Sequence, residues 1–315
     1  MIFRFMMILS RIACLFPESV GRTIAAGLGM TASRIWIPER SRILETMDRV
    51  YHRLGKHPPR PLFEIIDRMF IHFSLVAYES LRFPLLTTDL LQTRMVFHGV
   101  ENLEAALAPG KGVILAVPHL GSWEMLGAAI AHRGYPLHSF YLAQKENDIG
   151  TALDYFRGYS KIVLHDRDRG GLGALKALKY GEALGMIADQ DGGNHGVYID
   201  FLGHWVSMPA GPANWSLKLG AALVPLYCLR QGRSTQYDAW FFPALGTEQG
   251  RNHEERVIAR TRRLSAMTES WILAHPDQYL WFYDRFKPRH HVYLASLKTT
   301  GMTIQSGDAV YRPSA

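Results

Sequence analysis

From residue 96 onward, short apolar runs alternate with segments that have the residue spacing of helices. The apolar runs have the length of strands, and the segments between them are long enough to form helices that cover a sheet. Such alternation is typical of an α/β domain. Strands are predicted over residues 112–117, 183–187, 197–201 and 223–229, and helices over 120–132, 171–180 and 212–219.

The composition is that of a folded chain with a sizeable core. The 315 residues are 48% hydrophobic and 20% charged, with 16 prolines, which excludes a disordered or low-complexity chain. Two cysteines, Cys14 and Cys228, are too few for a disulfide framework or a Cys-x-x-Cys metal site. We therefore expect one or two folded domains in a reducing compartment.

The positive charge is concentrated at the N-terminus. The chain carries a net charge of +7, and residues 1–60 hold +6 of it, from ten Arg or Lys against four acidic residues. A basic region of this kind attracts anionic partners such as lipid membranes, acidic proteins or nucleic acids. Because residues 61–315 contain no basic stripe, nucleic-acid binding is not expected.

The first 38 residues are apolar but are interrupted by charges, so that no uncharged run reaches the ~18 residues of a simple membrane span. A signal peptide is also disfavoured, because Arg11 interrupts its apolar core. We expect an amphipathic or hairpin segment that lies in the membrane interface. Two alternatives stay open: helices packed on the protein's own core, and a tilted span with snorkelling arginines.

Prolines and composition divide the chain into three parts. Pro58, Pro59 and Pro61 precede a predicted helix over 62–83, and Pro276 stops another over 254–275. The predicted parts are a basic, apolar membrane-interface segment (1–60), an α/β domain (61–289) and a polar, loosely attached tail (290–315).

The most informative motif lies at the end of the first predicted strand. In GVILAVPHLGSWEMLG, residues 112–127, the strand runs directly into His119, and Glu124 follows in the first turn of a helix. Open α/β sheets bind ligands at such strand ends. His119 is therefore a candidate general base, oriented by Glu124, although a loop histidine and a helix-dipole carboxylate are the simpler interpretation of the same pattern. Ser122 lacks the G-x-S-x-G context of a nucleophile.

Further candidate residues lie in two later loops. Asp189 and Asp191 follow the strand 183–187, where they would bind a metal or substrate hydroxyls, or simply form a turn. Arg167 and Arg169 could grip a phosphate or be solvated. His195 and His204 match no zinc-ligand spacing, so no metal is expected.

Four blocks in the same order resemble the bacterial lipid A biosynthesis (lauroyl/myristoyl) acyltransferase superfamily, which includes phosphatidylinositol mannoside acyltransferase. The similarity runs over residues 40–289. The blocks are HLGSWE (119–124), which matches an H-x4-D/E signature, ADQDGG (188–193), MPAGPANWSLKLGAALVP (208–225) and HPDQYLWFYDRFKPR (275–289).

The resemblance implies an α/β fold like that of glycerolipid acyltransferases, with a mostly parallel or mixed central sheet flanked by helices. It implies transfer of a fatty acyl group from acyl carrier protein or acyl-CoA to a glycolipid hydroxyl, at the cytoplasmic face of the bacterial inner membrane, without cofactor or metal. His119 would be the base and Glu124 its orienting carboxylate. The substrate-binding residues that it implies are Arg167, Arg169, Asp189 and Asp191. Beside them, Trp123 could line an acyl channel, and Ser122 is a further candidate for substrate binding.

Two features depart from the family pattern. The lipid A branch begins with a clear spanning helix, whereas charges interrupt this segment. The mannoside branch has a glutamate where this chain has Tyr198. A lipid A precursor is the expected acceptor, and the alternatives are an acyl-CoA enzyme acting on another glycolipid or lysophospholipid, and a non-catalytic peripheral lipid-binding protein. The sequence leaves the acyl chain length open.

Overall fold

The computed structural model describes residues 2–141, 148–166, 171–246, 249–286 and 309–311. Its centre is a seven-stranded sheet in the order β1-β9-β8-β2-β5-β3-β4. Neighbouring strands run parallel except for β8 and β9. The strands are β1 (Met95–His98), β2 (Val113–Val117), β3 (Leu137–Tyr141), β4 (Val163–Asp166), β5 (Ala183–Ile187), β8 (Ala222–Arg230) and β9 (Tyr237–Phe241). The predicted α/β fold is therefore confirmed.

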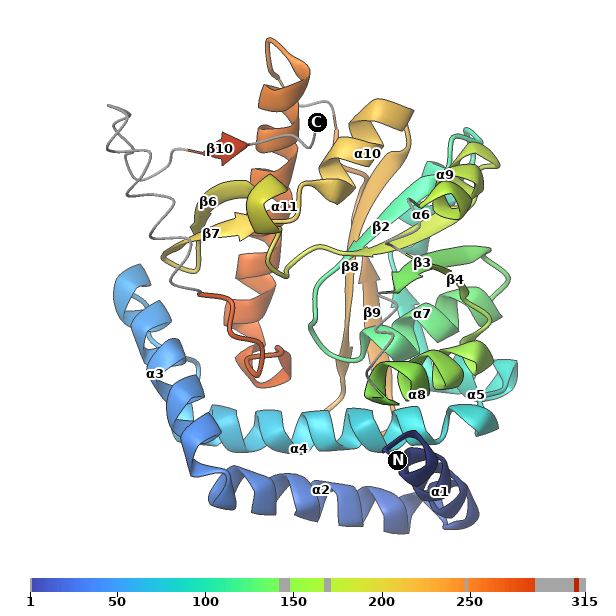
Figure 1. Ribbon diagram of the computed structural model, residues 1–315, viewed down its shortest axis with the longest axis vertical. Helices are drawn as coiled ribbons and strands as arrows, with labels where there is room; N and C mark the ends of the chain where they lie inside the picture. The colour runs from blue at the N-terminus through green and yellow to red at the C-terminus, as the bar shows by residue number, and fades with distance from the viewer. Residues whose placement is uncertain (1, 142–147, 167–170, 247–248, 287–308, 312–315) are drawn as a thin grey trace.

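Helices cover both faces of this sheet (Figure 1). On one face lie α5 (Thr88–Arg94), α6 (Val100–Leu107), α7 (Trp123–His132) and α8 (Asp148–Arg157). On the other face, α9 (Leu172–Lys179), α10 (Gly211–Leu219) and α11 (His253–Ala274) form the cover. Strand β2 is apolar at every position because Val113 and Leu115 face the first layer while Ile114 and Ala116 face the second.

A second, antiparallel sheet holds the strand predicted over 197–201. It consists of β6 (Val197–Phe201), β7 (His204–Met208) and β10 (Val310–Tyr311), in the order β10-β6-β7. The chain reverses after β6 through Leu202 and Gly203, which both have positive φ angles. Such a two-residue turn returns the chain antiparallel, so this strand pairs with β7 rather than with the parallel sheet.

Four helices at the base of the molecule precede the sheet (Figure 1): α1 (Ile2–Leu15), α2 (Glu18–Ile35), α3 (Ile37–Leu54) and α4 (Leu62–Leu81). A buried ionic cluster ties them to the sheet. Glu79 on α4 accepts hydrogen bonds from Arg22 of α2, from Arg230 of β8 and from the Tyr237 hydroxyl of β9. Arg22, which the sequence placed among basic residues suited to a lipid surface, is thus buried.

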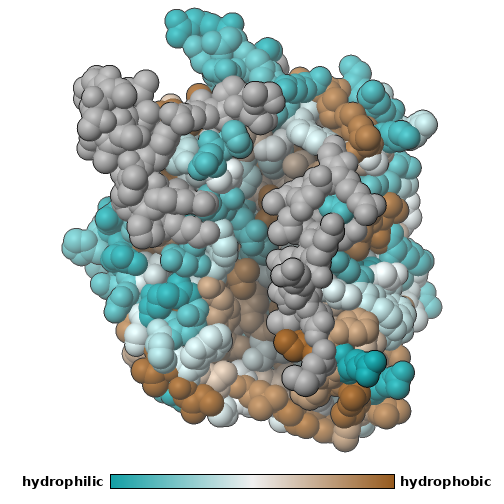
Figure 2. Space-filling model, viewed as in Figure 1, coloured by the Kyte–Doolittle hydropathy of each residue, from teal (hydrophilic) through white to brown (hydrophobic). Residues whose placement is uncertain are grey.

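The outer side of α1 and α2 is apolar and exposed. Figure 2 shows hydrophobic residues along the lower edge of the molecule, where Figure 1 places these helices. The exposed side chains include Phe5, Ile8, Leu15, Ile24, Leu28, Ile35 and Trp36. Over the described residues, no helix combines the length and the apolar character needed to cross a bilayer.

Candidate active site

The loop between β2 and α7 carries His119 and is held firmly in place. Gly121 has a φ of +68°, and an added Cβ would lie 1.7 Å from the Cys228 carbonyl oxygen, so only glycine fits here. The Gly121 amide donates to the Gln278 carbonyl over 2.9 Å, and its own carbonyl lies 3.1 Å from His72 Nε2. The backbone that presents His119 is therefore anchored on both sides.

His119 is paired with Asp189, at the end of the neighbouring strand β5. Its Nδ1 lies 2.8 Å from Asp189 Oδ1, and its backbone amide donates to Oδ2 over 3.1 Å. Both side chains are buried. Burial alone would raise the pKa of the Asp189 carboxyl, but His119 and then Arg285 outweigh it and lower that pKa. An ionised Asp189 accepts the Nδ1 proton and leaves Nε2 of His119 as a base.

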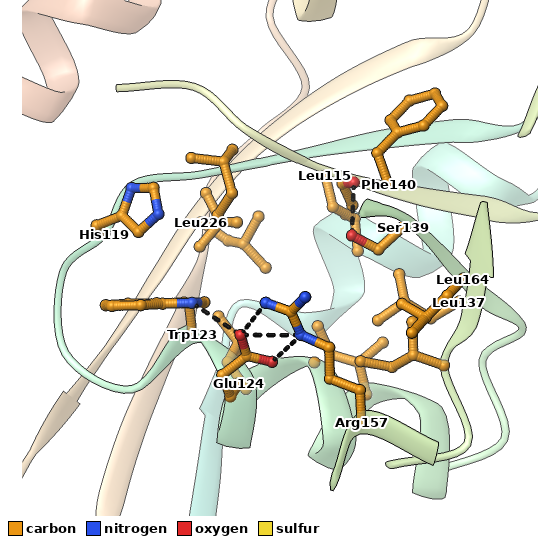
Figure 3. Close-up of a pocket in the computed structure, with 17 residues that line it drawn as sticks. Leu115, His119, Trp123, Glu124, Leu137, Ser139, Phe140, Arg157, Leu164 and Leu226 are labelled. Carbon is orange, nitrogen blue, oxygen red and sulfur yellow. Dashed lines mark hydrogen bonds and ion pairs between the residues drawn. The ribbon is translucent and has the colours of Figure 1, made fainter. Parts of the chain in front are cut away.

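The carboxylate that contacts His119 is thus not the predicted one. Glu124 was expected to orient His119, but it accepts hydrogen bonds from Arg157 Nε over 3.0 Å and Nη2 over 2.5 Å, and from Trp123 Nε1 over 3.2 Å (Figure 3). Because Glu124 lies in the first turn of α7, it meets α8, whereas His119 lies against β5. Burial lowers the pKa of Arg157, but the charge and hydrogen bonds of Glu124 raise it by more. The guanidinium group therefore stays charged.

Of the other predicted site residues that the structure describes, only Trp123 is found in contact with His119; Ser122 and Asp191 have other surroundings. Trp123 packs edge-on against His119, with ring centroids 4.6 Å apart. Ser122 is buried, and its hydroxyl has no hydrogen-bond partner among the described residues, so the geometry provides no base for it. Asp191 accepts a hydrogen bond from the Gly193 amide, the contact of a turn residue. Arg167 and Arg169 lie outside the described residues.

Three further residues, Gln190, Tyr279 and Arg285, surround the His119–Asp189 pair, and a fourth, Arg157, pairs with Glu124. None of the four was singled out in the sequence. The Gln190 amide lies 3.3 Å from His119 Nε2. Burial, followed by the negative charge of Asp189, raises the pKa of Tyr279, and burial lowers the pKa of Arg285. Tyr279 and Arg285 belong to the last of the four sequence blocks, which was the signal that could have found them. Arg157 lies in none of the four.

An apolar cavity opens beside His119. Figure 3 shows His119 and Trp123 at one side of it, Leu137 and Leu164 at the other, and the Glu124–Arg157 pair between them. The cavity lies between α7 and the sheet, and side chains of β2, β3, β4, β5 and β8 line it. A base beside an apolar slot suits chemistry at one end of a hydrophobic chain.

Comparison with known proteins identifies the family. The chain matches the sequence profile of bacterial lipid A biosynthesis acyltransferases over residues 1–288. It is 30% identical to a phosphatidylinositol mannoside acyltransferase of Mycobacterium tuberculosis, over 82% of this chain and 74% of that protein. A lipid A biosynthesis acyltransferase of Haemophilus influenzae is 24% identical, over 72% of this chain and 70% of that protein. The chain is an acyltransferase. It belongs to the bacterial lipid A biosynthesis acyltransferase family, as the four sequence blocks predicted.

Proposed function

We propose that this acyltransferase moves a fatty acyl chain from an acyl thioester, carried by acyl carrier protein, to a hydroxyl of a glycolipid, with a lipid A precursor as the acceptor. The observation that carries the proposal is the His119–Asp189 pair at the mouth of an apolar cavity. The cavity suits the acyl chain, and the imidazole of His119, which lines it, would lie next to the thioester carbon.

The chemistry requires one proton carrier. His119 Nε2 takes the proton of the acceptor hydroxyl while its oxygen attacks the thioester carbonyl, and Asp189 stabilises the resulting imidazolium. The tetrahedral intermediate then expels the thiolate, which takes the proton from His119, so that an ester and a free thiol are the products. Arg157, held by Glu124 at the same cavity, supplies a cation for the developing oxyanion.

Charge and surface support the proposed donor and the proposed membrane location. The exposed basic residues of region 1–60, among them Arg4, Arg11 and Arg49, suit both the acidic acyl carrier protein and an anionic lipid surface. The exposed apolar side of α1 and α2 would lie in the interface of the cytoplasmic membrane leaflet, which holds the protein as a peripheral, monotopic enzyme. The second candidate for the acceptor is a phosphatidylinositol mannoside, because the mycobacterial relative is named as an acyltransferase of that lipid.

A direct test follows thiol release and lipid acylation together. Full-length protein is incubated with a bacterial glycolipid extract and either acyl-carrier-protein thioester or acyl-CoA. We expect thiol release in step with a new acylated glycolipid, and a higher kcat/KM with the carrier-protein donor. Preference for acyl-CoA would contradict the proposed donor, whereas release with neither donor would favour a non-catalytic lipid-binding protein.

The length of the cavity should set the preferred acyl chain. A Cβ at Gly127 would lie 2.8 Å from Ile162 Cδ1, and both residues line the cavity. Gly127→Ala should push Ile162 into the cavity and reduce kcat/KM for the longest accepted chain about tenfold relative to a shorter one. Ile162→Ala should shift the preference toward longer chains.

A panel of donors with different chain lengths checks this prediction. Gly27→Ala is the matched control, since it adds a methyl group to helix α2 where no atom lies within 4 Å. If the two cavity variants shift the preference in the same direction, or Gly127→Ala leaves it unchanged, then the acyl chain does not extend between Gly127 and Ile162.

A further inference from the structure

A second cavity lies beside α4, next to the residues that support the catalytic loop. Helix α4 directs Phe73 toward Trp123 of the catalytic motif, with ring centroids 6.3 Å apart. Arg68, His72 and Leu75 lie on the other side of the helix and line a cavity of about 400 Å³. The remaining walls come from residues 59–60, from the β8–β9 turn and from residues 274–278.

The cavity is positively charged. Three arginines line it, Arg60, Arg68 and Arg233, against a single carboxylate, Asp277. Across the described ranges, none of the three guanidinium groups has a hydrogen-bond or ion-pair partner, in contrast to Arg22 and Arg230 nearby, which bind Glu79. Three unpaired guanidinium groups around one concavity provide the donors that a phosphate group requires.

The backbone of Arg233 is held in place by hydrogen bonds. The turn that carries Arg233 is held by Arg22, which donates to the backbone carbonyls of Arg233 over 2.5 Å and of Ser234 over 2.6 Å. Arg22 is itself held by the buried Glu79. The backbone beneath Arg233 therefore needs little ordering when an anion binds, which reduces the entropic cost of binding.

The surroundings favour an anion that is attached to an apolar chain. Ile65, Ile71 and Leu75 form an apolar wall of the cavity. Ile71, Leu75 and Arg233 also line a neighbouring groove of about 770 Å³ between α2 and α4. Beside this groove, α2 exposes Ile24 and Leu28 on its outer side. A phosphate in the cavity would therefore have space for acyl chains next to it, along a surface that is already apolar.

Two residues of the cavity also hold the catalytic loop. His72 and Gln278 line the cavity, and they are the residues that bond the carbonyl and the amide of Gly121. Burial lowers the pKa of His72 to about 3, so its imidazole stays neutral and keeps this contact at physiological pH. A ligand in the cavity would touch the supports of the His119 loop without entering the active site.

We propose that this cavity, lined by Arg60, Arg68 and Arg233, binds the phosphate headgroup of an anionic phospholipid. The site is separate from the acyl cavity, and its occupant is a bound lipid rather than a substrate. It anchors the enzyme at an anionic membrane next to the loop that carries His119. The proposal concerns binding alone and does not depend on acyl transfer.

Calorimetric titration with a short-chain, monomeric phosphatidic acid tests the proposal. The test variant is the full-length protein with Arg60→Gln, Arg68→Gln and Arg233→Gln. The charge-matched control carries Lys176→Gln, Lys179→Gln and Lys218→Gln on α9 and α10, at the far end of the molecule (Figure 1). All six side chains are exposed, so neither variant removes a buried contact. We expect saturable binding by the wild type, about tenfold or more weaker binding by the arginine variant, and less than twofold change in the control.

Each of the other outcomes would overturn the proposal in a distinct way. Equal losses in both variants would reveal general electrostatic attraction rather than a site. Inorganic phosphate that binds as tightly as the phospholipid would identify a free anion as the ligand. If the arginine variant binds phospholipid normally but has a raised KM for acyl carrier protein, then the arginines form a protein docking surface instead.

Discussion

Asp189→Asn is expected to lower kcat by about 10³- to 10⁴-fold, because the amide cannot serve as the ionised acceptor that keeps the proton on Nδ1 of His119. The substitution keeps the shape of the side chain, and single-turnover acyl transfer measures its effect.

Thermal unfolding separates a positioning role from structural damage. Asp189 is buried with Tyr279 and Arg285 beside it, so the variant will lose some stability, and the folded fraction at the assay temperature is measured to correct kcat for that loss. Glu124→Gln is the matched control: it weakens the hydrogen bonds to Arg157 and should cost about 10²-fold in kcat, less than Asp189→Asn. If Glu124→Gln lowers kcat more than Asp189→Asn does, Glu124 orients His119 after all.

Much of the fold could be predicted because the elements that bury both faces leave a strong pattern. The runs predicted over 183–187 and 223–229 are β5 and β8, and the segment predicted as a helix over 171–180 is α9. Strand β9 lacks the continuous apolar run of a strand that is buried on both faces, because Asp238 interrupts its apolar residues. It is also antiparallel to β8. Strand order also lay beyond the sequence, because it depends on which apolar faces meet in space.

The sequence predicts those site residues that directly follow a buried strand. His119 and Asp189 each come two residues after a buried strand, and parallel neighbours bring these ends together. Their pairing was missed because Glu124 is closer in sequence, five residues from His119, while Asp189 is seventy residues away. The direction in which each carboxylate points decides which of them contacts His119. Glu124, in the first turn of α7, points toward α8, where Arg157 neutralises its charge.

His119→Ala is expected to lower kcat by at least about 100-fold, since it removes the base that accepts the acceptor's proton. Removal of the imidazole should leave donor binding largely intact, because most of the residues that line the cavity are apolar and are unchanged in the variant. Equilibrium binding of a thioether analogue of the donor, which cannot react, measures that separately from turnover.

The same variant distinguishes an enzyme from a lipid-binding protein built on this fold. A protein whose role is lipid binding should keep its function when His119 is lost, because the exposed apolar side of α1 and α2 does not involve that residue. An enzyme should lose acyl transfer while its binding to vesicles stays unchanged. His119→Ala protein that still releases thiol at the wild-type rate would place the base elsewhere, and Asp189 would then serve only to stabilise the loop between β2 and α7.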